Sequence, residues 1–152
     1  MARALIMSKE HVSNEDDDKI IAIFDNVRTI ALIGASDKPE RDSHKVMAFL
    51  INKGYQVFPV NPLLAGKSIQ GCEVYSSLAD IPQPIDLVDV FRDSKYLYDI
   101  VVETKQAKVK RIWAQIGVMD AEAELLASNN DILMISNRCP AIELPRLMVK
   151  IN

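Results

Sequence analysis

The sequence predicts an α/β fold in which helices cover both faces of a doubly wound parallel sheet, giving three layers. Short apolar segments alternate with segments of helical periodicity along most of the chain, as in βαβ units. Several of these segments are apolar at nearly every position, which is typical of strands buried on both faces. The first is followed at once by Gly34-Ala35-Ser36, a tight strand-to-helix turn. Right-handed crossovers then favour the doubly wound arrangement.

Composition and charge limit the classes of protein to which this sequence can belong. The chain of 152 residues is 49% hydrophobic and 26% charged, so we expect one domain over residues 1–152, with a core at about 25–147 and a loose segment at 1–12. The net charge of −3 argues against a nucleic-acid partner. No apolar segment approaches the roughly 20 residues of a membrane span, and no secretory signal is visible. We therefore expect a cytoplasmic protein without a membrane partner, in which Cys72 and Cys139 are free thiols.

The N-terminal part predicts a helix. Four apolar residues follow the acidic run 13–18 at helical spacing: Ile20, Ile21, Phe24 and Val27. Acidic residues in a first turn suit the positive end of the helix dipole. We therefore interpret the run as a helix start, with a metal site as the alternative.

A strand, a helix and a second strand follow. The strands are expected at Thr29–Ile33 and Gln56–Val60, with Pro59 near a strand end because proline donates no hydrogen bond to a sheet. Ser43 is expected to cap the helix, and Gly54 to end it. The helix is expected to pack through Val46, Met47, Leu50 and Ile51.

The alternation continues in the second half of the chain. Residues 63–84 are the least regular, with a short strand at Cys72–Tyr75 and a helical turn near Leu78. Further strands are expected at Ile85–Phe91, Val109–Ile116 and Ile132–Ile135. One intervening helix should pack through Leu97, Ile100, Val101 and Thr104, and the next should begin at Asp120 and include Leu125 and Leu126. Pro140 and Pro145 predict a partly irregular tail from Asn137.

Candidate binding residues lie where the strands end, because ligands of doubly wound sheets bind outside the carboxyl ends of the strands. In the first strand-end segment, Gly34 permits a sharp turn, and Ala35 and Ser36 offer N–H groups to a phosphate. Ser43 and His44 open the next helix, whose free N–H groups attract an anion. Positive charge is supplied nearby by Lys38, Arg41 and Lys45. The alternative is a tight turn without a ligand.

This turn lacks the NAD fingerprint. That motif needs three glycines, and Gly34 is the only glycine between Lys19 and Lys53. It also needs an acidic residue after the second strand, where this chain has Asn61 and Pro62. Both departures argue against a nicotinamide dinucleotide.

Five strand-end segments together resemble a known family. They are Ile33-Gly34-Ala35-Ser36, Pro59-Val60-Asn61-Pro62, Val90-Phe91-Arg92, Gln115-Ile116-Gly117 and the run from Asn137 to Glu143. In order and spacing the chain resembles the small stand-alone CoA-binding proteins of bacteria and archaea, including the YccU-like proteins. It is also similar to the CoA-binding part of succinyl-CoA synthetase α and of ADP-forming acyl-CoA synthetases. The resemblance covers about residues 25–147.

The resemblance implies a Rossmann-like CoA-binding domain whose ligand is coenzyme A or an acyl-CoA. The nucleotide and phosphates would lie at the strand ends, in contact with Gly34, Ala35, Ser36, Lys38, Arg41, Ser43, His44, Asn61, Pro62, Phe91, Arg92, Gln115 and Gly117. The chain shows neither the catalytic histidine region nor the grasp domain of the larger enzymes, so we expect a binding protein without catalysis of its own. The alternatives are a small NAD(P)-linked oxidoreductase, a subunit of an acyl-CoA ligase system, or an interaction domain that has lost its ligand. A protein partner stays open.

Three side chains carry two interpretations each. His44 has the pKa range of a general base, but a hydrogen bond at the helix start is the favoured role. Arg92 suits a bidentate contact with phosphate or a surface salt bridge. Cys139 is expected to be a buried, inert thiol, with a mixed disulfide to CoA as the alternative. No metal ligand set and no catalytic residue is predicted.

Overall fold

Five apolar segments form one parallel sheet in the order β2-β1-β5-β6-β7. The computed structural model describes residues 16–151, with side chains for residues 16–147. The strands of the sheet are β1 (Thr29–Ile33), β2 (Gln56–Val60), β5 (Leu87–Val90), β6 (Arg111–Ala114) and β7 (Leu133–Ile135). A small antiparallel pair, β3 (Ser68–Ile69) and β4 (Cys72–Glu73), lies beside β2.

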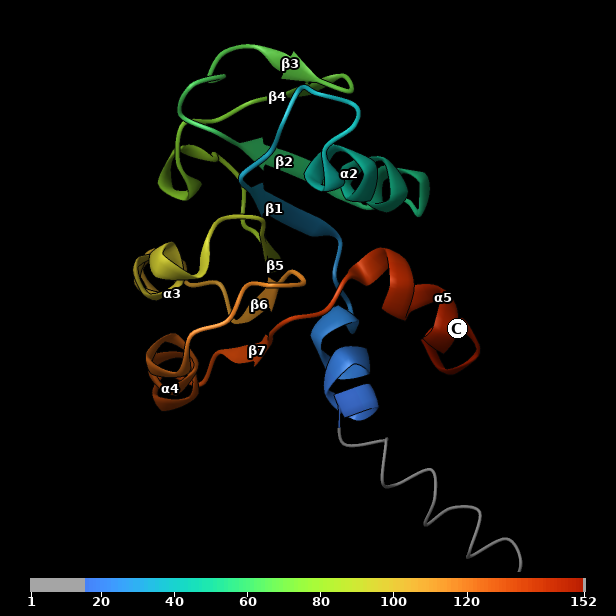
Figure 1. Cartoon of the computed structure of the whole chain (residues 1–152), viewed down its shortest axis with the longest axis vertical. Coiled ribbons are helices and arrows are strands. Elements are labelled where there is room, and N and C mark those ends of the chain that lie inside the picture. Colours follow the sequence, from blue (N-terminus) through green and yellow to red (C-terminus); the bar gives the residue numbers. More distant parts are fainter. Residues whose placement is uncertain (1–15, 152) are drawn as a thin grey trace, which may run out of the picture.

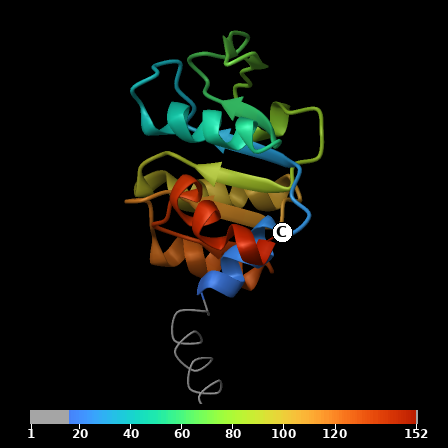
Figure 2. The same cartoon turned by 90° about the vertical axis from the view of Figure 1, so that its right-hand side faces the viewer.

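Helices cover both faces of this sheet, as the sequence predicts (Figure 1). The helices are α2 (Asp42–Asn52), α3 (Leu97–Gln106), α4 (Ala121–Asn129), α5 (Pro140–Ile151) and a helical segment at 16–24, with two short 3-10 helices, η1 (Leu78–Asp80) and η2 (Ser94–Tyr96). One face carries α2, α5 and the segment at 16–24, which Figure 2 shows in front of the strands. The other face carries α3, α4 and η1.

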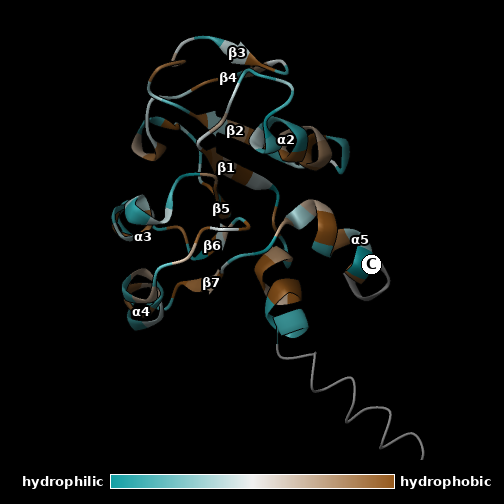
Figure 3. Cartoon of the chain, viewed as in Figure 1, coloured by the Kyte–Doolittle hydropathy of each residue, from teal (hydrophilic) through white to brown (hydrophobic). Residues whose placement is uncertain are grey.

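The strands separate two apolar cores. Ile30 and Leu32 point to the α2 face, where they pack with Trp113, whereas Ala31 and Ile33 pack with Val88 on the α3 face. This burial on both faces explains why the strands are continuously apolar. In Figure 3 the strands are accordingly mostly brown, and the outer turns of α4 are more hydrophilic.

Most predicted elements are confirmed. The first two strands have the predicted bounds, and all four predicted residues of α3 are buried. Asp120 caps α4 by accepting a hydrogen bond from the N–H of Ala123 at 2.9 Å. Pro59 lies one residue before the end of β2, an edge strand.

The predicted cap of α2 is wrong, whereas the predicted extent of α4 is confirmed. The residue before α2 is Arg41, which makes no side-chain cap, and Ser43 is buried within the first turn. In α4 the small residues Ala123 and Ala127 face the core, whereas Leu125 is 62% exposed. The helix includes Leu125 and Leu126, as predicted, and it packs on the core through its alanines and the partly buried Leu126.

The predicted irregular tail is wrong, because α5 is a helix from Pro140 onward. Pro140 stands in the first position, where the missing N–H costs nothing. Pro145 lies inside the helix but is exposed, and its neighbours Leu144 and Leu147 are buried. Burial of this apolar face outweighs the hydrogen bond that Pro145 removes.

Ion pairs join α5 to the helical segment at 16–24. The guanidinium of Arg146 donates to both carboxylate oxygens of Asp17, at 2.6 and 3.1 Å, and to Glu143 at 2.7 Å. These carboxylates raise the pKa of Arg146, with Asp17 as the larger cause. Arg138 pairs with Asp16 at 2.8 Å and with Glu143 at 3.5 Å. The acidic run thus supplies the partners of two arginines.

The expectation of a loose segment at 1–12 lies outside the described residues, as do residues 13–15 of the acidic run. None of the helices within 16–151 combines the length and apolar character that a bilayer crossing needs.

Candidate functional site

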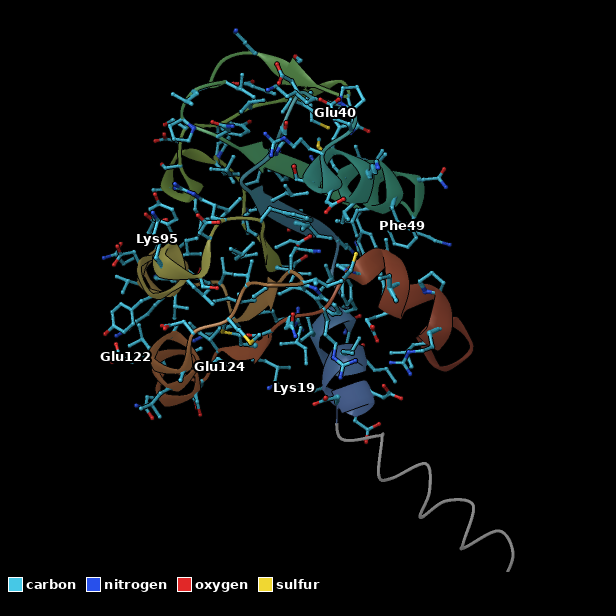
Figure 4. All side chains as sticks on the ribbon, in the orientation of Figure 1. Lys19, Glu40, Phe49, Lys95, Glu122 and Glu124 are labelled. Carbon is cyan, nitrogen blue, oxygen red and sulfur yellow. The ribbon has the colours of Figure 1, made fainter. Side chains whose placement is uncertain are left out.

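The sheet places one crevice at the carboxyl ends of β1 and β5. From β1 the chain crosses through α2 to β2 on one side, and β5 lies on the other side and leads to α3. Because α2 and α3 cover opposite faces, the loops that follow β1 and β5 diverge. Figure 4 shows Glu40 on the loop before α2 and Lys95 beside the start of α3, the two loops that flank the crevice.

On the α2 side lies a cavity of about 570 Å³, which we call the turn cavity. Its walls are the loop after β1, the start of α2 and the loop after β2. The lining residues are Gly34, Ala35, Ser36, Asp37, Lys38, Arg41, Asp42, Ser43, Asn61, Leu63, Leu64 and Phe91.

Gly34 is required by the shape of this turn. Its φ is +92°, and a Cβ at this position would lie 2.9 Å from the backbone oxygen of Phe91 and 3.2 Å from Cγ of Arg92. The N–H groups of Gly34 and Ala35 both donate to the carbonyl of Val60, at 3.0 and 3.2 Å. The Ala35 N–H is therefore occupied, contrary to its expected role as a phosphate donor.

Other N–H groups remain available. Among the described residues, the N–H groups of Ser36 and Asp37 have no protein acceptor, nor do those of Asp42 and Ser43 in the first turn of α2. The Ser36 hydroxyl oxygen accepts from the N–H of Lys38 at 3.1 Å, which leaves its own O–H free to donate. The turn cavity thus collects N–H donors from a turn and from a helix start, as anion sites do.

Two side chains hold the turn in place. His44 Nδ1 lies 2.9 Å from the carbonyl oxygen of Ser36, and because a carbonyl only accepts, this nitrogen carries the proton and donates. Asn61 donates from Nδ2 to the carbonyl of Ala35 at 2.8 Å and accepts at Oδ1 from the N–H of Leu63 at 2.9 Å. The favoured interpretation of His44 as a helix-start hydrogen bond is confirmed.

The turn cavity has charges of both signs. Lys38 and Arg41 are exposed cations without an ion pair in the described part of the chain. Asp37 and Asp42 also line the cavity. The two cations are long and mobile, so they can approach an anion held by the N–H groups while the aspartates turn to solvent.

On the α3 side lies a second cavity of about 500 Å³, which we call the α3 cavity. It shares Gly34, Asn61 and Leu63 with the turn cavity. The remaining lining residues are Ile33, Val60, Pro62, Ser76, Ser77, Leu78, Arg92, Tyr96, Asp99, Ile100 and Glu103.

Arg92 belongs to the α3 cavity. Its guanidinium lies 3.9 Å from the centre of the Tyr96 ring, a cation–π contact, and it forms no ion pair within residues 16–147. Asp99 and Glu103 line the same cavity. The alternative of a surface salt bridge for Arg92 is therefore absent from the described ion pairs, and the guanidinium is available to a ligand.

Most of the predicted binding residues gather at these two cavities. Gly34, Ala35, Ser36, Lys38, Arg41, Ser43, Asn61 and Phe91 line the turn cavity, Pro62 and Arg92 line the α3 cavity, and His44 contacts the turn from behind. Gln115 and Gly117 line neither cavity. Their binding role stays a prediction.

The run from Asn137 to Glu143 has a structural role. Asn137 accepts from the N–H of Gly117 at 2.8 Å, and Arg138 accepts at its carbonyl from Trp113 Nε1 at 2.7 Å. The carbonyl of Cys139 accepts from the first turn of α5, and its half-buried side chain packs against the α2-face core. Cys139 lines neither cavity, so the mixed disulfide stays an untested alternative.

Sequence reasoning missed several lining residues, including Leu63, Leu64, Ser76, Ser77, Asp99 and Glu103. Leu63 directly follows the Asn61-Pro62 turn, but its 88% exposure is evident only from the structure. Asp99 and Glu103 are four residues apart, so they share one face of α3, opposite the predicted buried face. The serines lie in the irregular segment, where no periodicity indicates direction.

A buried carboxyl lies in the sheet close to the crevice. Asp89 on β5 is in register with Leu32 and Trp113, and hence faces the α2 side. It is fully buried, and neither of its carboxylate oxygens has a hydrogen-bond partner. Burial raises the pKa of Asp89 well above its ordinary value. Gln115 Oε1 and Ser136 Oγ are also buried without partners.

Comparison with known families gives one match that covers most of the chain. The family model described as the CoA binding domain (CoA_binding_2) matches residues 28–145. This range contains both cavities and all five strands of the sheet.

Individual relatives agree with this match. An uncharacterised Bacillus subtilis protein, YneT, is 33% identical over 128 residues, which are 84% of this chain and 93% of that protein. Subunit alpha of an ADP-forming acetate–CoA ligase from Pyrococcus furiosus is 32% identical over 90 residues, which are 59% of this chain but 19% of that subunit. The solved structure of a Thermus thermophilus protein, cell-free ID.343, is 34% identical with a TM-score of 0.81, covering 86% of this chain and 98% of that one.

Proposed function

This chain belongs to the CoA binding domain family, and we propose that it binds coenzyme A in the crevice, with the diphosphate in the turn cavity. The observation that carries the proposal is the Gly34 turn, which directs unpaired N–H groups of the turn and of α2 into one cavity. A phosphate there would receive N–H donors and the positive end of a helix dipole together.

The residues of the turn cavity fit the diphosphate group of CoA. Gly34 lets the turn pack directly against the Phe91 backbone, where any side chain would clash, and its positive φ allows the sharp turn that forms the cavity wall. The Ser36 hydroxyl and the Lys38 and Arg41 cations would add charge-assisted hydrogen bonds to phosphate oxygens. His44 and Asn61 would keep the turn in its binding shape before the ligand arrives, which reduces the entropy lost on binding.

The second strand end supports CoA over a nicotinamide dinucleotide. A dinucleotide fold holds the ribose hydroxyls through a carboxylate after the second strand. Here Asn61 stands at that place, and its amide is bonded on both sides to the protein backbone. It therefore has a scaffold role. The carboxylates that line the turn cavity, Asp37 and Asp42, belong to the loop after β1 and to the start of α2, and neither follows the second strand.

We propose that this chain by itself binds CoA and catalyses no reaction. Neither His44 nor Ser36 belongs to a nucleophile–base pair, because His44 bonds the Ser36 carbonyl and the Ser36 hydroxyl accepts from the Lys38 N–H. In the α3 cavity the Ser76 hydroxyl donates to the Asp80 carboxylate, and none of the described residues that line this cavity is a histidine. The matched ligase subunit is about five times longer than the region it shares with this chain, as its 19% coverage shows. We expect acetyl-CoA to release no thiol above the blank rate when incubated with the protein.

Thermal melting in the presence of ligands tests the proposal. A ligand at 100 times its dissociation constant adds about 2.7 kcal/mol to the free energy of unfolding. We expect CoA to raise Tm at micromolar concentration, and NAD and ATP to require far higher concentrations. A rise with NAD and none with CoA would contradict the proposal. Native mass spectrometry of freshly purified protein provides a second measurement, with a retained mass equal to that of CoA as the expected result.

A further inference from the structure

A third cavity continues the crevice along the seam between η1 and α3. This rear cavity has a volume of about 470 Å³. Its apolar lining includes Leu78, Ala79, Ile81, Ile85, Ala107 and Val109. Ile85 and Val109 precede β5 and β6, so the rear cavity lies towards the amino-terminal ends of these strands. The Gly34 turn lies at the carboxyl end of β1.

The three cavities form a continuous series. The rear cavity shares Ser77, Leu78 and Glu103 with the α3 cavity, which in turn meets the turn cavity at Gly34 and Asn61. From Tyr96 to Glu103 the α3 cavity follows seven residues, and at 1.5 Å per helical residue this is about 10 Å. A long, flexible ligand can therefore extend from the carboxyl ends of the strands towards their amino-terminal ends.

Charge changes along this series. The turn cavity has the cations Lys38 and Arg41 together with free N–H groups. The α3 cavity has one cation, Arg92, beside Asp99 and Glu103, and the lining of the rear cavity within the described residues includes no lysine or arginine. An elongated ligand with phosphates at one end and an apolar group at the other would match this order.

We propose that the natural ligand is an acyl-CoA whose acyl chain occupies the rear cavity. This inference rests on the proposed function, because the phosphate end must first be held in the turn cavity. The pantetheine arm would then follow α3, where the carboxylates of Asp99 and Glu103 accept hydrogen bonds from its amide N–H groups. The thioester would lie near Ser77 and Glu103, and the chain beyond it would contact Leu78 and Ile81.

Calorimetric titration with CoA, acetyl-CoA and octanoyl-CoA tests this assignment. Each methylene that leaves water strengthens binding about fourfold at full burial. The rear cavity is open to solvent along part of its length, since Ala79 and Ala107 are exposed. We therefore expect octanoyl-CoA, used below its micelle concentration, to bind at least about tenfold more tightly than acetyl-CoA.

Two variants and a matched control test whether the acyl chain of the ligand lies in the rear cavity. Ala79→Trp and Ala107→Trp each place an indole in the rear cavity, and both alanines line neither of the other cavities. Ala121→Trp makes the same change at another exposed alanine, the first residue of α4, which lines none of the three. Melting of each variant verifies that it folds, and two independent rear-cavity variants keep the test valid if one does not.

The outcomes separate this inference from the function on which it rests. Support requires that either rear-cavity variant abolish the advantage of octanoyl-CoA, keep its affinity for CoA within about twofold, and differ from Ala121→Trp in this respect. Equal affinities for CoA, acetyl-CoA and octanoyl-CoA overturn the acyl-chain assignment and leave CoA binding intact. An advantage that survives in both folded variants also overturns it, because the chain then lies elsewhere. Failure of all three ligands to bind contradicts the proposed function itself.

Discussion

The turn cavity and the α3 cavity meet at Gly34, yet they are built in different ways. The turn cavity is formed by backbone that is fixed by hydrogen bonds, with the turn held by Val60, His44 and Asn61. The charged side chains that line the α3 cavity are exposed, and apart from the stacking of Arg92 on Tyr96 they form no ion pair or hydrogen bond with the described residues. This difference indicates that the turn cavity is a pre-formed binding site for an anion, whereas the α3 cavity is a surface that can adapt to the rest of a ligand.

The largest expected effect comes from the residue that both cavities share. Gly34→Ala forces a left-handed alanine and drives its Cβ against the Phe91 carbonyl. We expect the free energy of unfolding to fall by about 2–4 kcal/mol and CoA binding to become undetectable by calorimetry. Gly54→Ala is the control, because Gly54 also has a positive φ but nothing within 4 Å of the added Cβ. Its cost should be about 1–2 kcal/mol, with unchanged binding; equal behaviour of the two variants would refute the close packing at Gly34.

A second variant separates stability from binding. Arg146→Met removes a guanidinium that pairs with Asp17 and Glu143, two carboxylates that are 8% and 11% exposed and line neither cavity. Because a largely buried carboxylate that loses an ion-pair partner is costly, we expect a loss of about 2–3 kcal/mol in urea unfolding. The affinity for CoA at a temperature where the variant is folded should not change. A parallel loss of affinity would show that α5 supports the crevice directly.

The cations of the turn cavity should have smaller effects. Arg41→Ala and Lys38→Ala each remove a charge that can contact phosphate, and we expect each to weaken CoA binding about tenfold at low salt. The difference should shrink in high salt, because exposed charges are screened. Lys53→Ala, at the far end of α2, serves as the matched control and should bind as the unmodified protein does. An equal loss in all three variants would indicate only a general effect of net charge.

The buried Asp89 lowers the free energy of unfolding little at acidic pH and increasingly as the pH rises. Burial raises its pKa in the folded protein, whereas the unfolded chain releases this proton near pH 4. Each pH unit above about 4 therefore favours the unfolded chain by about 1.4 kcal/mol, until the raised pKa is reached. Asp89→Asn removes this cost, so its gain in unfolding free energy should be small near pH 4 and increase with pH until the raised pKa of Asp89 is reached. A gain independent of pH would show that Asp89 is ionised in the folded protein.

Much of the fold follows from local sequence signals. Continuous apolar segments predicted the five strands, and the spacing of Leu97, Ile100, Val101 and Thr104 predicted the buried face of α3. The same reasoning failed for α5, because two prolines are a strong local signal against a helix. Tertiary contacts prevailed there: Leu144 and Leu147 are buried, and Glu143 and Arg146 join the ion pairs with Asp17.

The site was only half predictable. The residues of the turn are adjacent in sequence, and a glycine after a strand identifies them directly. The α3 cavity combines the irregular segment at 76–78 with one exposed face of α3, and that pairing depends on how η1 packs against α3. The bond of Ala35 to Val60 also depends on tertiary geometry, which is why its N–H was wrongly expected to be free.

The central claim is that CoA lies across Gly34, with phosphates on the α2 side and the arm along α3. An ¹⁵N–¹H NMR titration of the full chain with CoA tests it most directly. The account predicts saturable shifts in the amides of Ser36, Asp37 and Ser43, joined by those of Arg92, Tyr96 and Asp99. Shifts confined to α4, α5 and the segment at 16–24, or no saturable shifts at all, would contradict it.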